Sequence, residues 1–227
     1  MKPTTKVAQT TAPDGATFEL YEHDGQYQLH MDRHPVMTTT LTHSEKLLAD
    51  IGCHKMKNPR VLIGGLGLGF SMRRALEITG PDSKVVVAEL LPEVVRWNSE
   101  CLNGLNDDII ADSRSSIVNL DVYDLILTAA QKGPKYDAIL LDVDDGPSRL
   151  IQPQNQQLYG TSGLDLIKDA LNPGGRLAIW TAGNEPKLMK AMRRAGFRTE
   201  ETHCAKHVNA KRKIHRIYMG ELPAGKS

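Results

Sequence analysis

Carboxylates gather after one apolar segment in the middle of the chain. The sequence ILLDVDDGPSRL places Asp142, Asp144 and Asp145 within four positions, directly after a run of aliphatic residues. Carboxylates this close repel one another, and an amine or another cation among them relieves the repulsion. We therefore expect a ligand site here, with a bare acidic turn as the alternative. No His or Cys lies near enough in sequence to complete a metal site.

A second candidate segment, VLIGGLGLGFSMRRAL, joins an apolar run to a helical pattern through four glycines. They are Gly64, Gly65, Gly67 and Gly69. Glycine tolerates positive φ and lets the backbone approach a ligand, and the N–H groups at a helix start favour a polar or anionic group. The segment predicts a ligand-binding loop between a strand and a helix, and a tight turn without a ligand is the alternative.

Acidic residues also follow the next two predicted strands. Glu89 lies near the end of the run KVVVAEL, twenty residues after Gly69. A carboxylate there can accept hydrogen bonds from both hydroxyls of a ribose. Asp112 follows DDII, which we interpret as the third strand, and its position suits contact with an adenine amino group. The alternative for Asp112 is a helix N-cap.

The segments that must position these residues alternate from Arg60 onward. Five apolar runs predict buried strands, namely RVLIGG, KVVVAEL, DII, YDAILLDV and GRLAIW. The amphipathic segments SMRRALEIT, PEVVRWNSECL, GLDLIKDAL and EPKLMKAMRRAG predict helices between them. Two more strands, FRTEETHC and KIHRIYMGEL, complete an α/β fold with a doubly wound, mostly parallel seven-stranded sheet.

The chain before this domain has a different character. We expect 1–15, rich in Thr and Pro, to form a flexible arm. Residues 16–58 predict a small hairpin, with Asp24 and Gly25 in its turn, followed by the helix LTHSEKLLADIG. The Rossmann-like domain then spans 59–222.

Composition limits the classes of function. The 227 residues are 40% hydrophobic and 24% charged, with 28 Lys plus Arg against 27 Asp plus Glu. The balanced charge gives no reason to expect a nucleic-acid partner, and no apolar run is long enough for a membrane span. The three cysteines form no C-x-x-C pair. We expect a soluble, cytoplasmic protein.

Taken together, these residues resemble the class I S-adenosylmethionine-dependent transferases and, within them, the spermidine synthase-like family. The resemblance spans about 37–219. It is carried by GGLGLG, by Glu89 and Asp112, by DVDDGP in place of the family's Asp-Ser-Ser-Asp-Pro loop, and by LNPGGRLAIW. It implies that the four glycines and Asp142 surround the donor, that Glu89 binds ribose and that Leu90 covers adenine.

The resemblance also implies roles on the acceptor side. Asp142 matches the family's catalytic acid, and Asp145 its second acid. His43 is expected to contact substrate. From the positions of the residues, we further expect Asp144 or Asp145 to hold a second polar group and Tyr159 to help from a lid or acceptor wall. A homodimer is expected, because the N-terminal hairpin can extend the sheet of a second copy.

The family's remaining motif positions are altered in this chain. The family's glycine loop carries an Asp that contacts the aminopropyl amine of decarboxylated S-adenosylmethionine, and here Gly67 or Leu68 stands in its place. The family's Tyr-His pair appears as His43-Ser44, and its preceding Gln as Met37. A donor with a free cationic amine needs a carboxylate nearby, whereas the carboxylate of S-adenosylmethionine suits bare loop N–H groups.

We therefore favour S-adenosylmethionine as the donor and methyl transfer to a small polar or amine-bearing acceptor, with Asp142 as the base or as the group that orients the acceptor. Aminopropyl transfer from decarboxylated S-adenosylmethionine is the first alternative. A noncatalytic nucleoside-binding subunit is the second.

Overall fold

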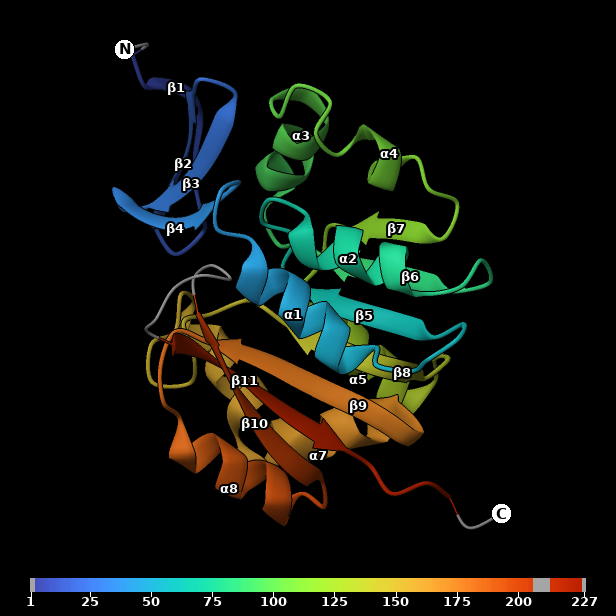
Figure 1. Cartoon of the computed structure of the whole chain (residues 1–227). Coiled ribbons are helices and arrows are strands. Elements are labelled where there is room, and N and C mark those ends of the chain that lie inside the picture. Colours follow the sequence, from blue (N-terminus) through green and yellow to red (C-terminus); the bar gives the residue numbers. More distant parts are fainter. Residues whose placement is uncertain (1–2, 206–212, 226–227) are drawn as a thin grey trace.

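Two sheets form the framework of the protein (Figure 1). The computed structural model describes residues 3–205 and 213–225. The N-terminal sheet is antiparallel, and its strands lie in chain order: β1 (Thr5–Thr11), β2 (Thr17–His23), β3 (Gln26–Met31) and β4 (His34–Thr38).

The larger sheet has seven strands in the order β10-β11-β9-β8-β5-β6-β7. Their bounds are β5 (Arg60–Gly64), β6 (Lys84–Ala88), β7 (Ser115–Val118), β8 (Tyr136–Leu141), β9 (Leu171–Thr181), β10 (Arg198–Ala205) and β11 (Lys213–Glu221). Only β11 runs antiparallel to its neighbours, so the predicted mostly parallel seven-stranded sheet is confirmed.

Helices cover both faces of this sheet (Figure 1). One face carries α1 (His43–Gly52) and α2 (Phe70–Ile78), and the other carries α5 (Val122–Gln131), α7 (Thr161–Ala170) and α8 (Pro186–Arg194). The shorter elements are α3 (Pro92–Glu100), α4 (Asp107–Ile110), the 3-10 turn η1 (Pro153–Asn155) and α6 (Gln156–Tyr159). Within the described ranges, no helix has the length and apolarity of a membrane span.

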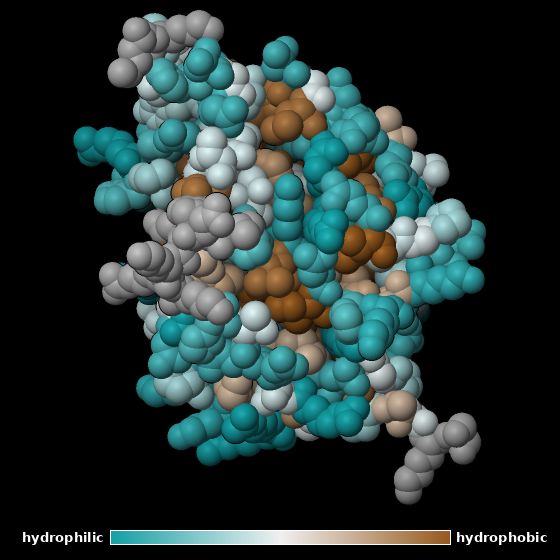
Figure 2. All heavy atoms as spheres, in the orientation of Figure 1, coloured by the Kyte–Doolittle hydropathy of each residue, from teal (hydrophilic) through white to brown (hydrophobic). Residues whose placement is uncertain are grey.

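The inner strands of the large sheet have uninterrupted apolar sequences because helices cover both faces of the sheet. Val61, Leu62 and Ile63 of β5 are fully buried. Val61 and Ile63 pack in the cluster that contains α1 and α2, whereas Leu62 packs in the cluster that contains α5 and α7. On the outside, hydrophilic side chains cover most of the face seen in Figure 2, and apolar ones show only in separate small areas.

The order of the sheet determines where a ligand can bind. The chain leaves β5 toward β6 on one side, while β8 lies on the other side of β5. The carboxyl ends of β5 and β8 therefore border the crevice that forms where the strand order reverses. Gly65 follows β5 and Asp142 follows β8, so the two candidate segments meet there.

The prediction of a flexible N-terminal arm is wrong. Residues Thr5–Thr11 form β1, which pairs with β2, and Lys6 Nζ lies 3.0 Å from Glu19 Oε1. The sequence gives little signal for β1 because most of its side chains are exposed. Backbone hydrogen bonds to β2 hold it in the sheet. The expected hairpin is present as β2 and β3, with positive φ at Asp24 and Gly25, but β1 and β4 extend it to four strands.

The third strand of the large sheet was also misplaced. The sequence DDII forms the short helix α4, in which Ile109 is buried, and the strand beside β6 is β7, with the sequence SSIV. A short apolar run does not distinguish a strand from a buried helical turn. The error shifts the carboxyl end of this strand from Asp112 toward Asp121.

Candidate active site

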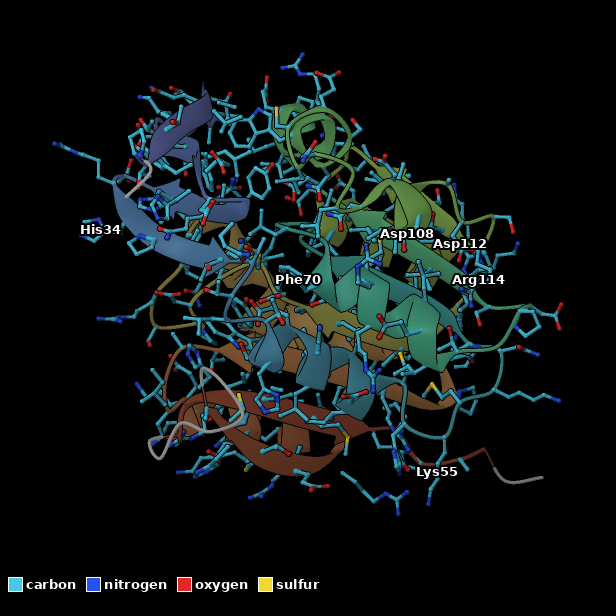
Figure 3. The ribbon with its side chains drawn as sticks, turned by 45° about the horizontal axis from the view of Figure 1, so that its top comes forward. His34, Lys55, Phe70, Asp108, Asp112 and Arg114 are labelled. Carbon is cyan, nitrogen blue, oxygen red and sulfur yellow. The ribbon has the colours of Figure 1, made fainter. Side chains whose placement is uncertain are left out.

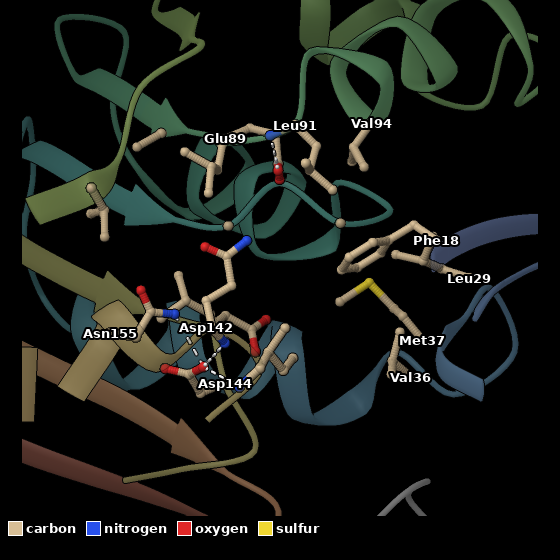
Figure 4. A pocket seen from close by; sticks show the side chains of 18 of the residues that line it. Phe18, Leu29, Val36, Met37, Glu89, Leu91, Val94, Asp142, Asp144 and Asn155 are labelled. Atoms are coloured by element: carbon tan, nitrogen blue, oxygen red, sulfur yellow. Dashed lines mark hydrogen bonds between the residues drawn. The ribbon is translucent and has the colours of Figure 1, made fainter. Parts of the chain in front are cut away.

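A cavity lies where the N-terminal sheet faces the carboxyl ends of the parallel strands (Figure 4). Phe18, Leu29 and Met37, from β2, β3 and β4, line one side. The glycine loop and the segments after β6, β7 and β8 line the others, together with Trp180 near the end of β9. The site is thus built from both sheets.

The glycine loop forms one wall through close backbone packing. Gly65 and Gly67 line the cavity, and both have positive φ, of 89° and 51°. A Cβ at Gly65 would lie only 2.6 Å from the backbone oxygen of Asp142. Gly64 and Gly69 do not line the cavity: Gly64 packs against Val122, and Gly69 precedes α2 in a left-handed conformation.

Glu89 lines the cavity, and two backbone N–H groups hold its carboxylate. Its Oε2 accepts a hydrogen bond from the Leu66 N–H at 2.9 Å, and its Oε1 accepts one from the Leu91 N–H at 3.0 Å. The residue is 9% exposed, and burial raises the pKa of its carboxyl. Leu90 lines the cavity beside it. The backbone N–H groups of Gly67 and Leu90 also favour the ionised form of Glu89.

Asp112 lies outside the cavity. Its carboxylate pairs with Arg114 at 2.6 Å, before β7 rather than after it (Figure 3). The acid at the cavity end of β7 is Asp121, which lines the cavity and accepts a hydrogen bond from the Tyr123 N–H as the N-cap of α5. A signal for it was present in the sequence: Asp121 separates the strand SSIV from the apolar helix VYDLILTAAQ.

Asp142 reaches the cavity directly from the end of β8. Its Oδ2 lies 3.4 Å from Ser71 Oγ, which donates a hydrogen bond from the first turn of α2. Burial and the nearby charge of Glu45 raise the pKa of Asp142 to about 7. A carboxylate with this pKa can accept a proton near neutral pH.

The other two acids of this loop differ in their surroundings. Asp144 is 3% exposed and accepts hydrogen bonds from the Ile151 N–H, from Asn155 Nδ2 and from the Tyr159 hydroxyl, the last at 2.8 Å. It therefore anchors the following loop, although it also borders the cavity. Tyr159 does not line the cavity. Asp145 lines it without such a set of donors to its side chain.

Glu45 is a cavity residue that the sequence analysis missed. It lies in the first turn of α1, is 7% exposed, and accepts a hydrogen bond from Ser44 Oγ at 2.7 Å. Its neighbour His43, predicted to contact substrate, does not line the cavity. The available signal was spacing, because Glu45 shares the buried face of the helix with Leu48 and Ala49.

The sequence is similar to those of polyamine aminopropyltransferases, whereas no protein-family model matches it. It is 32% identical over 123 residues to polyamine aminopropyltransferase 1 of Hyperthermus butylicus, which covers 53% of this chain and 40% of that protein. The polyamine aminopropyltransferase of Corynebacterium efficiens is 27% identical over 168 residues, covering 73% and 29%. That of Pyrobaculum calidifontis is 32% identical over 128 residues, covering 56% and 43%. The chain thus matches less than half of the length of each.

Solved spermidine synthases have the same fold. A spermidine synthase in complex with the transition state analogue AdoDATO gives a TM-score of 0.76 at 17% identity, over 95% of this chain and 73% of that one. The spermidine synthase of Thermotoga maritima gives 0.73 at 15% identity, over 95% and 72%.

These relatives contradict our preference for methyl transfer, because their names assign them aminopropyl transfer. The preference assumed that the glycine loop had to supply the carboxylate for a cationic amine. The glycine loop does not have to supply it, since Glu45 brings a carboxylate into the cavity from α1. In sequence the chain is thus similar to polyamine aminopropyltransferases, and in fold it is similar to solved spermidine synthases.

Proposed function

We propose that the chain is an aminopropyltransferase that moves the aminopropyl group of decarboxylated S-adenosylmethionine to an amine acceptor. One observation carries the proposal: within the described chain, the cavity lining has six acidic side chains and no Lys, Arg or His. The six are Glu45, Glu89, Asp121, Asp142, Asp144 and Asp145. A lining of this kind favours cationic ligands and disfavours the carboxylate of S-adenosylmethionine.

The donor's nucleoside fits the side of the cavity around Glu89. The Glu89 carboxylate, fixed by two backbone N–H groups, would accept hydrogen bonds from the ribose hydroxyls. Leu90 and Leu120 offer apolar surface for adenine, and Asp121 offers an acceptor for its amino group. Gly65 and Gly67 bring their backbone to the cavity wall, so the sulfonium centre would lie against the loop on the way toward Asp142.

Asp142 is the proposed proton acceptor. The acceptor amine attacks the aminopropyl carbon next to the sulfonium, so that a C–N bond forms and a C–S bond breaks. The bonding electron pair stays with sulfur, which leaves as neutral methylthioadenosine, and the amine proton goes to Asp142. The pKa of about 7 suits this step, because the group is substantially ionised at neutral pH and still basic enough to take the proton.

The residues around Asp142 complete the acceptor side. Asp145 borders the cavity and is the candidate to bind a second ammonium of a diamine. Asp144 and Tyr159 act as positioning residues, because their hydrogen bond fixes the loop that carries Asp145. The predicted homodimer stays a prediction.

The proposal is tested by steady-state release of methylthioadenosine. The purified chain is incubated with decarboxylated S-adenosylmethionine and a series of α,ω-diamines and polyamines at several concentrations. We expect amine-dependent release that Asp142→Asn lowers by about 10²- to 10⁴-fold, the usual contribution of a general base. Release that does not depend on any amine, or that is unchanged in Asp142→Asn, would contradict the proposal.

A further inference from the structure

One acidic residue interrupts the buried face of α1. Glu45, Leu48, Ala49 and Gly52 share this face at the spacing of successive helical turns, and all four are buried. Leu48 and Ala49 pack in the apolar cluster beneath the sheet, whereas Glu45, one turn earlier, reaches the cavity. A carboxylate in a buried position costs free energy unless a partner compensates its charge, so Glu45 calls for a partner.

Glu45 and Asp142 approach each other across the start of α2. The Ser71 hydroxyl lies 3.3 Å from the backbone oxygen of Glu45 and 3.4 Å from Oδ2 of Asp142. The charge of Glu45 contributes to the raised pKa of Asp142, and burial raises the pKa of Glu45 itself. The two carboxylates thus border the same part of the cavity and destabilise each other's ionised form.

Among the described residues, the charges of His43 and Lys46 lower the pKa of Glu45, but less than burial raises it. No ion pair of the described residues includes Glu45 or Asp142. Gly65 and Gly67 border the same cavity and bring backbone rather than charged side chains to it. The missing partner therefore fits a cation carried by a ligand.

The position of the pair indicates which cation. Glu89 marks the ribose end of the donor site, and Gly65 packs against the backbone of Asp142. With the ribose at Glu89, the substituents on the sulfur would lie toward Asp142 and Glu45, which line the same cavity. Asp142 must exchange a proton with the acceptor amine, whereas the amine of the donor does not react and has to stay charged. Glu45, which reaches the cavity from α1, is therefore the carboxylate available to the amine of the donor.

We propose that Glu45 selects the decarboxylated donor: it holds the ammonium of the aminopropyl group, and it repels the carboxylate of intact S-adenosylmethionine. The inference rests on the proposed function and assigns the specificity for the donor to α1 rather than to the glycine loop. Ser44 acts as a positioning residue, because its hydroxyl orients the Glu45 carboxylate.

Calorimetric titration tests this assignment with three ligands: decarboxylated S-adenosylmethionine, S-adenosylmethionine and methylthioadenosine, which lacks the amine. We expect Glu45→Gln to weaken binding of the decarboxylated donor about tenfold or more, as for a lost charge-assisted hydrogen bond. Methylthioadenosine should bind within about twofold of the wild type. The matched control is Glu77→Gln, the same change on the outer side of α2, which should leave all three affinities unchanged.

Equal weakening of the decarboxylated donor and methylthioadenosine, or no change in their ratio, would overturn the assignment. If Glu45→Gln does not fold, Glu45→Asp replaces it, since it keeps the charge but moves it back by one methylene. Selective weakening of the amine-bearing donor then supports the assignment, and equal weakening overturns it. A chain that shows the selectivity but releases no methylthioadenosine with any amine would contradict the proposed function and not the role of Glu45.

Discussion

The sulfur of Met37 accepts a hydrogen bond from the Leu68 N–H at 3.1 Å and thereby fills the space beside Gly67. A Cβ at Gly67 would lie 2.7 Å from Met37 Sδ and 2.8 Å from its Cε. The glycine loop therefore has no room for an acidic side chain at this position. Packing between β4 and the loop thus couples the methionine at 37 to the glycine at 67, and Glu45 supplies a carboxylate from elsewhere.

Placing an acid in the loop should weaken the site. Gly67→Asp has to displace Met37 and adopt a φ of 51°, which costs about 1–3 kcal/mol for a non-glycine residue. We expect a lower melting temperature and weaker binding of methylthioadenosine. The double variant Met37→Ala/Gly67→Asp should recover part of both losses, because the clash is gone. A Gly67→Asp variant as stable as the wild type would show that the packing is less tight.

The acids of the cavity should make the free protein less stable as the pH rises. The pKa of Asp142 is raised from its ordinary value of 3.8 to about 7, and those of Glu45, Glu89 and Asp144 are also raised. Between the unfolded and folded pKa values, the folded chain binds more protons than the unfolded chain, so stability falls as the pH increases through this window.

Urea unfolding between pH 4 and pH 8 measures this effect. Asp142→Asn removes the group with the pKa of about 7, so the variant should lose less stability across the upper part of the range than the wild type does. It should therefore be the more stable of the two at pH 8. Parallel curves for the two proteins would contradict the raised pKa of Asp142.

The hydroxyl of Tyr159 should contribute to stability and leave nucleoside binding intact. Tyr159→Phe removes the donor 2.8 Å from Asp144 Oδ2 in a buried setting, which should cost about 1–3 kcal/mol of unfolding free energy. Because Tyr159 does not line the cavity, the affinity for methylthioadenosine should change less than about twofold. Selective loss of nucleoside affinity with unchanged stability would assign the hydroxyl to the ligand instead.

Asp121 and Asp112 make a matched pair for the adenine side. Asp121→Asn keeps a good helix cap for α5 but removes an acceptor from the cavity lining. We expect it to weaken binding of methylthioadenosine by about tenfold, the value of one hydrogen bond of roughly 1.4 kcal/mol. Asp112→Asn should leave this affinity unchanged, because Asp112 pairs with Arg114 outside the cavity. The opposite pattern would support the original assignment.

Periodicity predicted the central sheet well because its strands are buried on both faces. In a chain of alternating helices and strands, the short apolar runs around Val61–Ile63 and Val85–Val87 predict buried strands. The loop glycines, Glu89 and Asp142 followed from the same logic, since they end those strands. The sequence was less informative for β1 and β7, which are short or exposed and are ordered by pairing with a neighbour.

Glu45 was missed for a different reason. The residue is far from the other acids in sequence, and only the packing of α1 against the sheet brings it next to Asp142. Compensation of this kind, in which one element lacks a charge and another supplies it, depends on tertiary contacts. The absence of an acid at Gly67 therefore led to methyl transfer as the preferred reaction, an inference that the relatives contradict.

The most direct test of the central claim is the identity of the group transferred. The chain is incubated with equal amounts of S-adenosylmethionine and decarboxylated S-adenosylmethionine and a mixture of amines, and the products are identified by mass spectrometry. We predict amines that gain an aminopropyl group, with matching amounts of methylthioadenosine. Methylated amines with S-adenosylhomocysteine, or no modified amine at all, would contradict the proposed aminopropyl transfer.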